Sequence, residues 1–312
     1  MHTFPAATSG PKLQTHAASD LRGVGAIIAR AIWRLAAGTA LVLALGGCSS
    51  VRLAYNQAPN LAYWWLDGFV DLNDAQSAVL RDDLNGFFAW HRTEEIPLYV
   101  ERLKQWQTLA TQDLTPATAC TQFEAVRSAY QRGIDRALPS LTRVALSLKA
   151  PQLDALARKH AKGNEEFEKE WLSGSPEERF QQRFDKASKR YADFYGRLSP
   201  AQTELLKNLR QRSGFDATRL QAERQRRQND LVASLKQAQA QPSQAPNILR
   251  QWHERAMRSP DAAYAAYSAA NVQDNCAQFA ALHNTTSAEQ RANAVKTLKG
   301  YETDLMALQR TD

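Results

Sequence analysis

Few side chains in this sequence have the type and spacing that catalysis or metal binding requires. The histidines after residue 48 are His91, His160, His253 and His283, and no two of them have a metal-site spacing such as H-x-x-x-H. His91 and Glu95, one helical turn apart, could supply two ligands, but an ion pair on a helix rim is the commoner role for this spacing. No nucleophile elbow, phosphate loop or dinucleotide fingerprint occurs. We expect no catalytic residues, no metal and no cofactor, and therefore no enzyme.

Cys48 is the residue whose surroundings predict a chemical modification. It follows two arginines, an apolar stretch from Leu35 to Leu45 and two glycines, an order typical of a secretory signal. The apolar stretch of about 11 residues is too short to span a bilayer, which needs about 20. We predict that residues 1–47 are a signal sequence that is removed. Residues 1–24 are long and polar for such a signal, which is also consistent with an artefact of start-codon choice.

The segment Leu45-Gly46-Gly47-Cys48 resembles the lipobox of bacterial lipoproteins. The resemblance implies that Cys48 is acylated and becomes the first residue of the mature chain, and two or three acyl chains anchor a protein firmly. Ser49 and Ser50 follow in place of an acidic retention signal, which favours the periplasmic face of the outer membrane over the inner membrane. The alternative is a free cysteine after an ordinary signal.

Two other cysteines remain for pairing once Cys48 is lipidated. Both are expected to face the core, because Cys120 lies in helical register with Phe123, Tyr130 and Ile134, and Cys276 with Val272 and Phe279. In an oxidising compartment two such thiols favour a disulfide, and the alternative is two buried free thiols.

A polar segment over residues 218–240 carries a group of arginines, Arg219, Arg224, Arg226 and Arg227. With few apolar positions, this helix is expected to be exposed or to bridge other units. The arginines could form a basic contact face for phosphate groups or an acidic protein, and the favoured alternative is a solvated helix. The net charge of +7 does not indicate nucleic acid, because an exported chain meets lipid and cell wall first.

Composition and periodicity predict helices throughout the mature chain. Ala, Leu, Gln, Arg, Glu and Lys are abundant while Val and Ile are scarce. The clearest amphipathic stripe steps by three or four residues, through Phe180, Phe184, Ala187, Tyr191, Phe194 and Leu198. No segment alternates with period two. The expected fold is all-α, a multi-helix bundle or array of amphipathic helices with no sheet, with a lipidated tether at 48–60 and a single periplasmic domain at 61–312.

An aromatic group lies soon after the predicted anchor. Leu61, Trp65, Phe69 and Leu72 share one helical stripe, which favours burial in the core. The alternative is contact with the headgroup region of a membrane, where tryptophan is favoured.

Helix starts recur in a common form. Leu72, Leu148, Leu198 and Thr286 are each followed four residues later by a glutamine. In three of the four, Asn73, Ser199 or Ser287 can cap the helix and the glutamine can reach back to complete a capping box. The string Leu198-Ser199-Pro200-Ala201-Gln202 resembles the L-T-x-x-Q element of periplasmic stress chaperones of the Spy and CpxP type, which are small cradle-shaped helical dimers.

A second resemblance covers most of the mature chain. Tyr55-Asn56, Pro59-Asn60, Trp64-Trp65, Gln76 and Trp90-His91-Arg92 resemble the opening signature of a family of uncharacterised proteobacterial lipoproteins. The resemblance implies an anchor and a helical fold, and no mechanism.

These observations predict a lipid-anchored periplasmic protein that binds or scaffolds other components of the envelope. The alternative function is a chaperone that holds unfolded outer-membrane clients. The expected partners are the membrane, through the acyl chains on Cys48, and an envelope protein or unfolded client. No oligomeric state is predicted.

Overall fold

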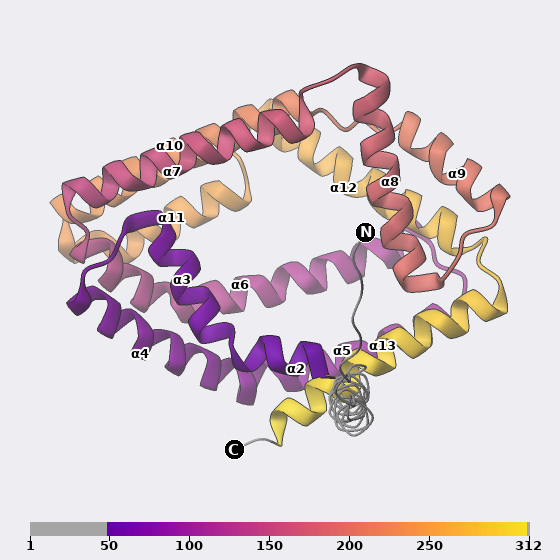
Figure 1. Cartoon of the computed structure of the whole chain (residues 1–312), viewed down its shortest axis with the longest axis horizontal. Coiled ribbons are helices and arrows are strands. Elements are labelled where there is room, and N and C mark those ends of the chain that lie inside the picture. Colours follow the sequence, from indigo (N-terminus) through magenta and orange to yellow (C-terminus); the bar gives the residue numbers. More distant parts are fainter. Residues whose placement is uncertain (1–48, 311–312) are drawn as a thin grey trace, which may run out of the picture. The chain divides into compact units, whose positions relative to one another are not determined.

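Helices account for nearly all of the chain that the structure describes. The computed structural model describes residues 49–310 and contains helices and no strand in that range (Figure 1), so the predicted all-α fold is confirmed. The α-helices are α2 (Ser49–Asn56), α3 (Ala58–Val70), α4 (Asp74–Trp90), α5 (Ile96–Ala110), α6 (Pro116–Ser147), α7 (Ala150–Trp171), α8 (Pro176–Tyr195), α9 (Pro200–Gln211), α10 (Ala217–Ala240), α11 (Ala245–Met257), α12 (Ala262–His283) and α13 (Ala288–Gln309). The predicted signal sequence and Cys48 lie outside the described residues.

The segment expected to be a tether, residues 48–60, contains helix α2. Within it the Tyr55 ring packs edge-on against Phe88, with centroids 5.9 Å apart, and the Tyr55 hydroxyl lies 2.9 Å from His91 Nδ1. The described residues from Val51 onward belong to one compact unit. Tyr55 is therefore packed against the helical unit.

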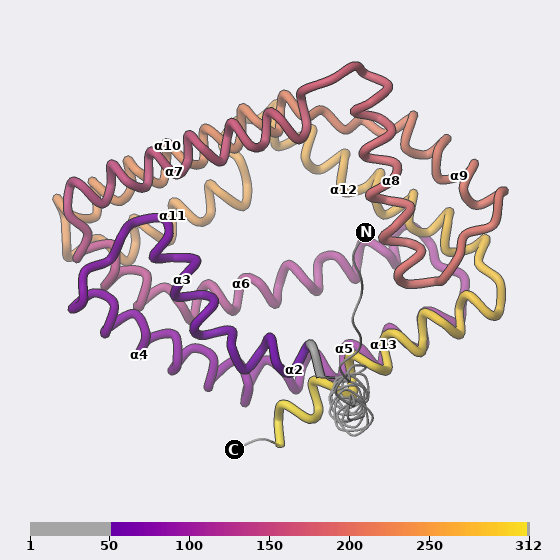
Figure 2. The backbone as a smooth tube through the Cα atoms, viewed as in Figure 1, coloured from indigo at the N-terminus to yellow at the C-terminus, as the bar shows by residue number. Residues whose placement is uncertain are grey.

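Helices α4 and α5 are joined through a single π-helical segment, η1 (His91–Glu95), and the tube in Figure 2 runs through it without a break. Pro97 lies just beyond η1, and a proline has no N–H to donate to the preceding turn. An extra residue in the turn accommodates this loss, as π-bulges do.

The predicted capping boxes are present at three helix starts. The side chains of Asn73, Ser199 and Ser287 each accept a hydrogen bond from the backbone N–H of the glutamine three residues later. Each of those glutamines accepts in return from the backbone N–H of the capping residue. At the fourth start only the return bond forms, from Lys149 N to Gln152 Oε1 at 2.9 Å.

The four motif glutamines meet in two pairs that the sequence did not predict. Gln76 and Gln152 exchange amide hydrogen bonds of 3.1 and 2.8 Å, which we call the first glutamine junction. Gln202 and Gln290 do the same at 2.8 and 2.9 Å, forming the second glutamine junction. Each glutamine thus caps its own helix and joins it to a helix start far away in sequence.

The two junctions share a second set of bonds. Every motif glutamine donates its side-chain N–H to the backbone carbonyl five residues before its partner glutamine. The bonds are Gln76 to Ser147, 2.8 Å; Gln152 to Asp71, 3.0 Å; Gln202 to Thr285, 2.9 Å; and Gln290 to Arg197, 3.0 Å. Such a match in donors, acceptors and spacing indicates the same local backbone arrangement at both places.

Helix contacts repeat in the same order around the junctions. At the first, α3 packs against α7 and α4 against α6; at the second, α8 packs against α13 and α9 against α12. The described chain therefore contains two similar four-helix arrangements, one of α3, α4, α6 and α7 and one of α8, α9, α12 and α13. Helix α5, which follows α4, lies side by side with α13 along much of its length.

The predicted stripe on α8 is confirmed. Ala187 and Tyr195 are buried, and Phe184, Tyr191 and Phe194 pack against two clusters of the core. By contrast, α10 is not the fully exposed helix that its polarity allowed. It packs against α7, α11 and α6 and buries Leu235 and Ala238 together with two polar side chains, Glu223 and Ser234.

The expected burial of the stripe on α3 holds only at its C-terminal end, where Phe69 and Leu72 pack against a core cluster. Tyr63 is buried and donates a hydrogen bond to Ser77 Oγ at 3.0 Å, whereas Trp64 and Trp65 are 60% and 64% exposed. Leu61 is exposed as well. The helix is turned so that the neighbouring register faces α4, and the tryptophans are left on the surface.

Over the described residues, no helix is both long enough and apolar enough to cross a membrane.

Candidate functional site

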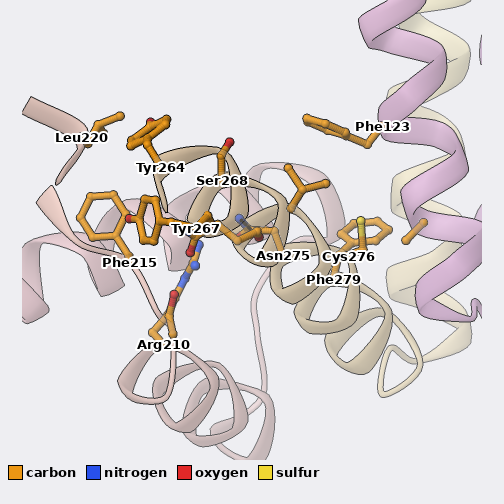
Figure 3. Close-up of a pocket in the computed structure, with 14 residues that line it drawn as sticks. Phe123, Arg210, Phe215, Leu220, Tyr264, Tyr267, Ser268, Asn275, Cys276 and Phe279 are labelled. Atoms are coloured by element: carbon orange, nitrogen blue, oxygen red, sulfur yellow. Dashed lines mark hydrogen bonds between the residues drawn. The ribbon is translucent and has the colours of Figure 1, made fainter. Parts of the chain in front are cut away.

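An aromatic pocket lies beside α12, between that helix, α6 and the start of α10 (Figure 3). Its cavity has a volume of 440 Å³, within the range of small-ligand sites. Aromatic rings from three parts of the chain line it: Phe123, Phe215, Tyr264, Tyr267 and Phe279. We call this cavity the α12 pocket.

The walls of the α12 pocket are fixed by polar and covalent bonds. Cys120 on α6 and Cys276 on α12 are joined by a disulfide, with Cα atoms 5.3 Å apart. Cys276 is buried, as expected, but Phe123 and Tyr130, which share the register of Cys120, are 47% and 51% exposed. The expectation that this face of α6 packs in the core is therefore wrong, and the disulfide borders the pocket instead.

Tyr267 is held by the segment that starts α10. Its hydroxyl accepts from Asp216 N at 2.7 Å and donates to Asp216 O at 3.2 Å. Asp216 also caps α10 by accepting from the backbone of Thr218 and Arg219. The ring of Tyr267 is thus locked to the N-terminus of α10.

One cation of the α12 pocket has no partner among the described residues. Arg210 extends from α9 toward Tyr267 (Figure 3), and its Nε is buried without a hydrogen bond. Close by, Arg183 lies over the Phe215 ring, 5.4 Å from its centroid. Burial, together with the charges of Arg179 and Arg210, lowers the pKa of Arg183. This side of the pocket therefore carries uncompensated positive charge.

A second cavity, of 530 Å³, lies beneath α3, α4, α6 and α11, and we call it the apolar cavity. Leucine, valine and aromatic side chains form nearly all of its lining. Trp65 and Tyr130 line it and are also exposed to solvent, so they lie at its rim. Trp252 also lines this cavity, and its indole N–H is buried without a hydrogen-bond partner.

The two cavities are joined by an exposed stripe on α6. Phe123 lines the α12 pocket, Tyr130 lines the apolar cavity, and Val126, 53% exposed, lies between them on the same helical face. Seven residues of helix separate Phe123 from Tyr130, about 10 Å. We call Phe123, Val126 and Tyr130 the apolar track.

The predicted basic face on α10 is not formed as one surface. Arg226 and Arg227 both donate to the buried carboxylate of Glu223, at 2.7 to 2.8 Å. Arg219 pairs with Asp216 at 3.3 Å, and Arg224 donates to Asn164 Oδ1 at 2.9 Å. A buried carboxylate needs charged donors. Arg226 and Arg227 therefore compensate the charge of Glu223 inside the protein.

Glu223 was not singled out in the sequence. Burial would raise its pKa, but hydrogen bonds from Arg226, Arg227 and Ser259 outweigh that effect and lower the pKa to about 2. A glutamate followed by arginines three and four residues later is a recognisable helical pair pattern. Periodicity could not show that the carboxylate, rather than the arginines, faces inward.

The histidines also take structural roles. His283 is buried; its Nε2 donates to Gln112 O at 2.7 Å, so its Nδ1 accepts from the Tyr195 hydroxyl at 2.8 Å. The expected His91–Glu95 pair is replaced, since Glu95 is buried and bonded by Arg132 at 2.7 and 2.8 Å. Over residues 49–310, no group of three His, Cys, Asp or Glu side chains is arranged to hold a metal ion.

A family model matches residues 68–261, which is more than half of the chain, and its description is a family of unknown function, DUF6279. The chain belongs to this family. The DUF6279 match includes the apolar track and Arg210, whereas Cys276 and Gln290 lie beyond it. Membership of an uncharacterised family, which the sequence predicted, is confirmed. No curated protein and no solved structure is significantly similar to the chain.

Proposed function

We propose that this DUF6279 protein is a lipid-anchored periplasmic protein of the outer membrane that binds apolar segments of envelope partners and performs no catalysis. The apolar track carries the proposal. Three exposed apolar side chains connect two cavities, and a continuous exposed apolar surface of this kind is typical of an interaction site. A stretch of polypeptide laid along α6 would bury all three side chains at once.

An exposed apolar face on α3, soon after the predicted acylation site at Cys48, supports the anchor. Leu61, Trp64 and Trp65 lie on one exposed face of α3, with i, i+3 and i+4 spacing. Tryptophan and leucine at such a position are suited to the boundary between headgroups and acyl chains.

The anchor is tested by a Cys48→Ala substitution. We expect the variant to leave the membrane fraction and to lose incorporation of labelled palmitate. A Lys236→Ala chain, changed at an exposed position on α10, is the matched control, because it keeps the acylation site and should remain membrane-bound. Unchanged membrane fractionation of the Cys48→Ala variant, in either its processed or its precursor form, would overturn the lipoprotein assignment.

Binding along the track is tested by photo-crosslinking in cells. A benzophenone amino acid at Val126 should form crosslinks with other envelope proteins that disappear when Phe123 and Tyr130 are both changed to serine. The same probe at Tyr301, which is 43% exposed on α13, is the matched control and should give none. Equal crosslinking from the two positions would contradict a specific track.

A chaperone that holds unfolded outer-membrane clients is the second candidate. The exposed aromatic side chains of the track and the duplicated capped helix starts favour it. The purified chain should then suppress aggregation of a reduced model client at a near-stoichiometric ratio. The F123S/Y130S variant should lose that effect, and no suppression by the unaltered chain over a wide range of ratios would eliminate this candidate.

A further inference from the structure

Arg210 is the feature of the α12 pocket that the track alone does not explain. Its Nε is buried without a hydrogen bond, and no carboxylate among the described residues forms an ion pair with its guanidinium. A buried donor without a partner costs free energy, and more so when it is charged. An arginine in this state is suited to receiving an acceptor from a ligand.

The charge around Arg210 narrows the choice of ligand. Arg183 and Arg179 lie on the neighbouring helix α8, and the pKa of Arg183 is lowered by burial and by the charges of Arg179 and Arg210. The carboxylate of Asp216, at the start of α10, already accepts from the backbone N–H groups of Thr218 and Arg219 and pairs with the Arg219 side chain. The pocket therefore favours an anionic group over a neutral or cationic one.

The residues that line the α12 pocket indicate what the rest of the ligand must be. Five aromatic rings surround the cavity, while Ser268, Asn271 and Asn275 add hydroxyl and amide groups along α12. Aromatic walls suit a flat or branched side chain, and amide side chains can bond a peptide backbone. The volume of 440 Å³ is sufficient for a terminal residue of a polypeptide but not for a folded element.

The apolar track continues this site away from Arg210. Phe123 belongs to both the pocket and the track, and at the other end the apolar cavity is lined by Trp252, whose buried indole N–H has no hydrogen-bond partner. A polypeptide supplies both kinds of acceptor, a terminal carboxylate and backbone carbonyls. A fatty acid supplies only the first.

We propose that the α12 pocket binds the C-terminus of a polypeptide partner, with the terminal carboxylate on Arg210 and the last side chain, aromatic or large and apolar, between Phe215, Tyr267 and Phe279. The preceding residues then follow the apolar track, so this inference rests on the proposed binding function and specifies its ligand. Capture of a carboxylate by an arginine is a charge-assisted hydrogen bond, stronger than a neutral one.

Calorimetry with a peptide pair tests the proposal on the full chain, purified with its disulfide intact and free of detergent. The probe is a ten-residue peptide of alternating apolar and polar residues that ends in phenylalanine, either as the free acid or as the amide. We expect the free acid to bind at least about tenfold more tightly, which corresponds to one hydrogen bond to a charged group. Arg210→Gln should abolish this preference, and Arg212→Gln, which changes the exposed C-cap residue of the same helix, should retain it.

Each other outcome overturns the assignment. Equal affinity for the acid and the amide peptide, or no binding of either, would show that the α12 pocket does not bind a terminal carboxylate. If laurate binds more tightly than the free-acid peptide, and if Arg210→Gln abolishes laurate binding, the pocket binds a lipid carboxylate instead. Crosslinking from Val126 tests the track separately, so a failed carboxylate preference and a failed binding function are distinguishable.

Discussion

Replacing Gln202 by alanine should destabilise the chain more than any ordinary helix substitution. The buried Gln202 side chain takes part in four hydrogen bonds: one from Ser199 N, one to Thr285 O and two with Gln290, all of 2.8 to 2.9 Å. A net contribution of about 1 kcal/mol for each bond predicts a loss of about 3 to 4 kcal/mol in the free energy of unfolding. The substitution leaves the backbone N–H of Ser199 and the carbonyl of Thr285 without these partners.

The measurement is urea unfolding followed by circular dichroism, with Gln237→Ala as the matched control. Gln237 is an exposed glutamine on α10, and its substitution should change the free energy of unfolding by less than about 0.5 kcal/mol. Gln76 makes equivalent bonds but is partly exposed, so water can replace some of them. Gln76→Ala should therefore cost less than Gln202→Ala.

A double-mutant cycle tests the pairing itself. Because two bonds join Gln202 to Gln290, the double variant should be about 1 to 2 kcal/mol more stable than the sum of the two single losses predicts. Additive losses would show that the glutamines act only as separate caps. A loss for Gln202→Ala as small as that for Gln237→Ala would refute the junction as a stabilising element.

Three further predictions concern the interior. The pKa of Glu223 is about 2 in the folded chain, against 4.5 for a free glutamate. Its carboxylate therefore stabilises the fold above pH 4.5, and that contribution should be lost as the pH falls toward 2. In urea titrations the Glu223→Gln variant should be less stable at pH 7 and should lack this part of the acid transition. Burial lowers the pKa of His283 below 6.5, so the unfolded chain binds more protons near that pH and stability should fall as the pH drops through 6.5; His283→Gln should show a smaller difference between unfolding midpoints at pH 5 and pH 7.5. The Cys120–Cys276 disulfide links positions 156 residues apart, for which the chain-entropy model gives at most about 5 kcal/mol of the free energy of unfolding. A C120S/C276S chain should therefore unfold at a markedly lower urea concentration. An unchanged unfolding midpoint would contradict this.

Local features were predictable from the sequence because they depend on residues within one or two turns. The caps at Asn73, Ser199 and Ser287 form as predicted, since each joins a side chain to a backbone group three residues away. The amphipathic stripe on α8 was also predicted, because its spacing of three and four residues specifies one face of a helix.

Which face is covered was not predictable from periodicity alone. The stripe of Phe123 and Tyr130 on α6 and the stripe of Trp65 on α3 both suggested core packing, yet all three side chains are exposed. A stripe identifies an apolar face and says nothing about whether another helix reaches it. The same limit explains Glu223, whose burial depends on where α11 and the residues after it lie.

The sequence by itself determined a helical chain with capped starts, and it predicted an export signal with an acylation site at Cys48. Only the tertiary structure decided that the capping glutamines pair across 76 and 88 residues of chain, that Arg210 lies unpaired in an aromatic pocket, and that the track on α6 is open. Caps and periodicity arise from neighbours along the chain, whereas pairing and exposure arise from segments that meet only after folding. The candidate binding surface depends entirely on segments that meet only after folding.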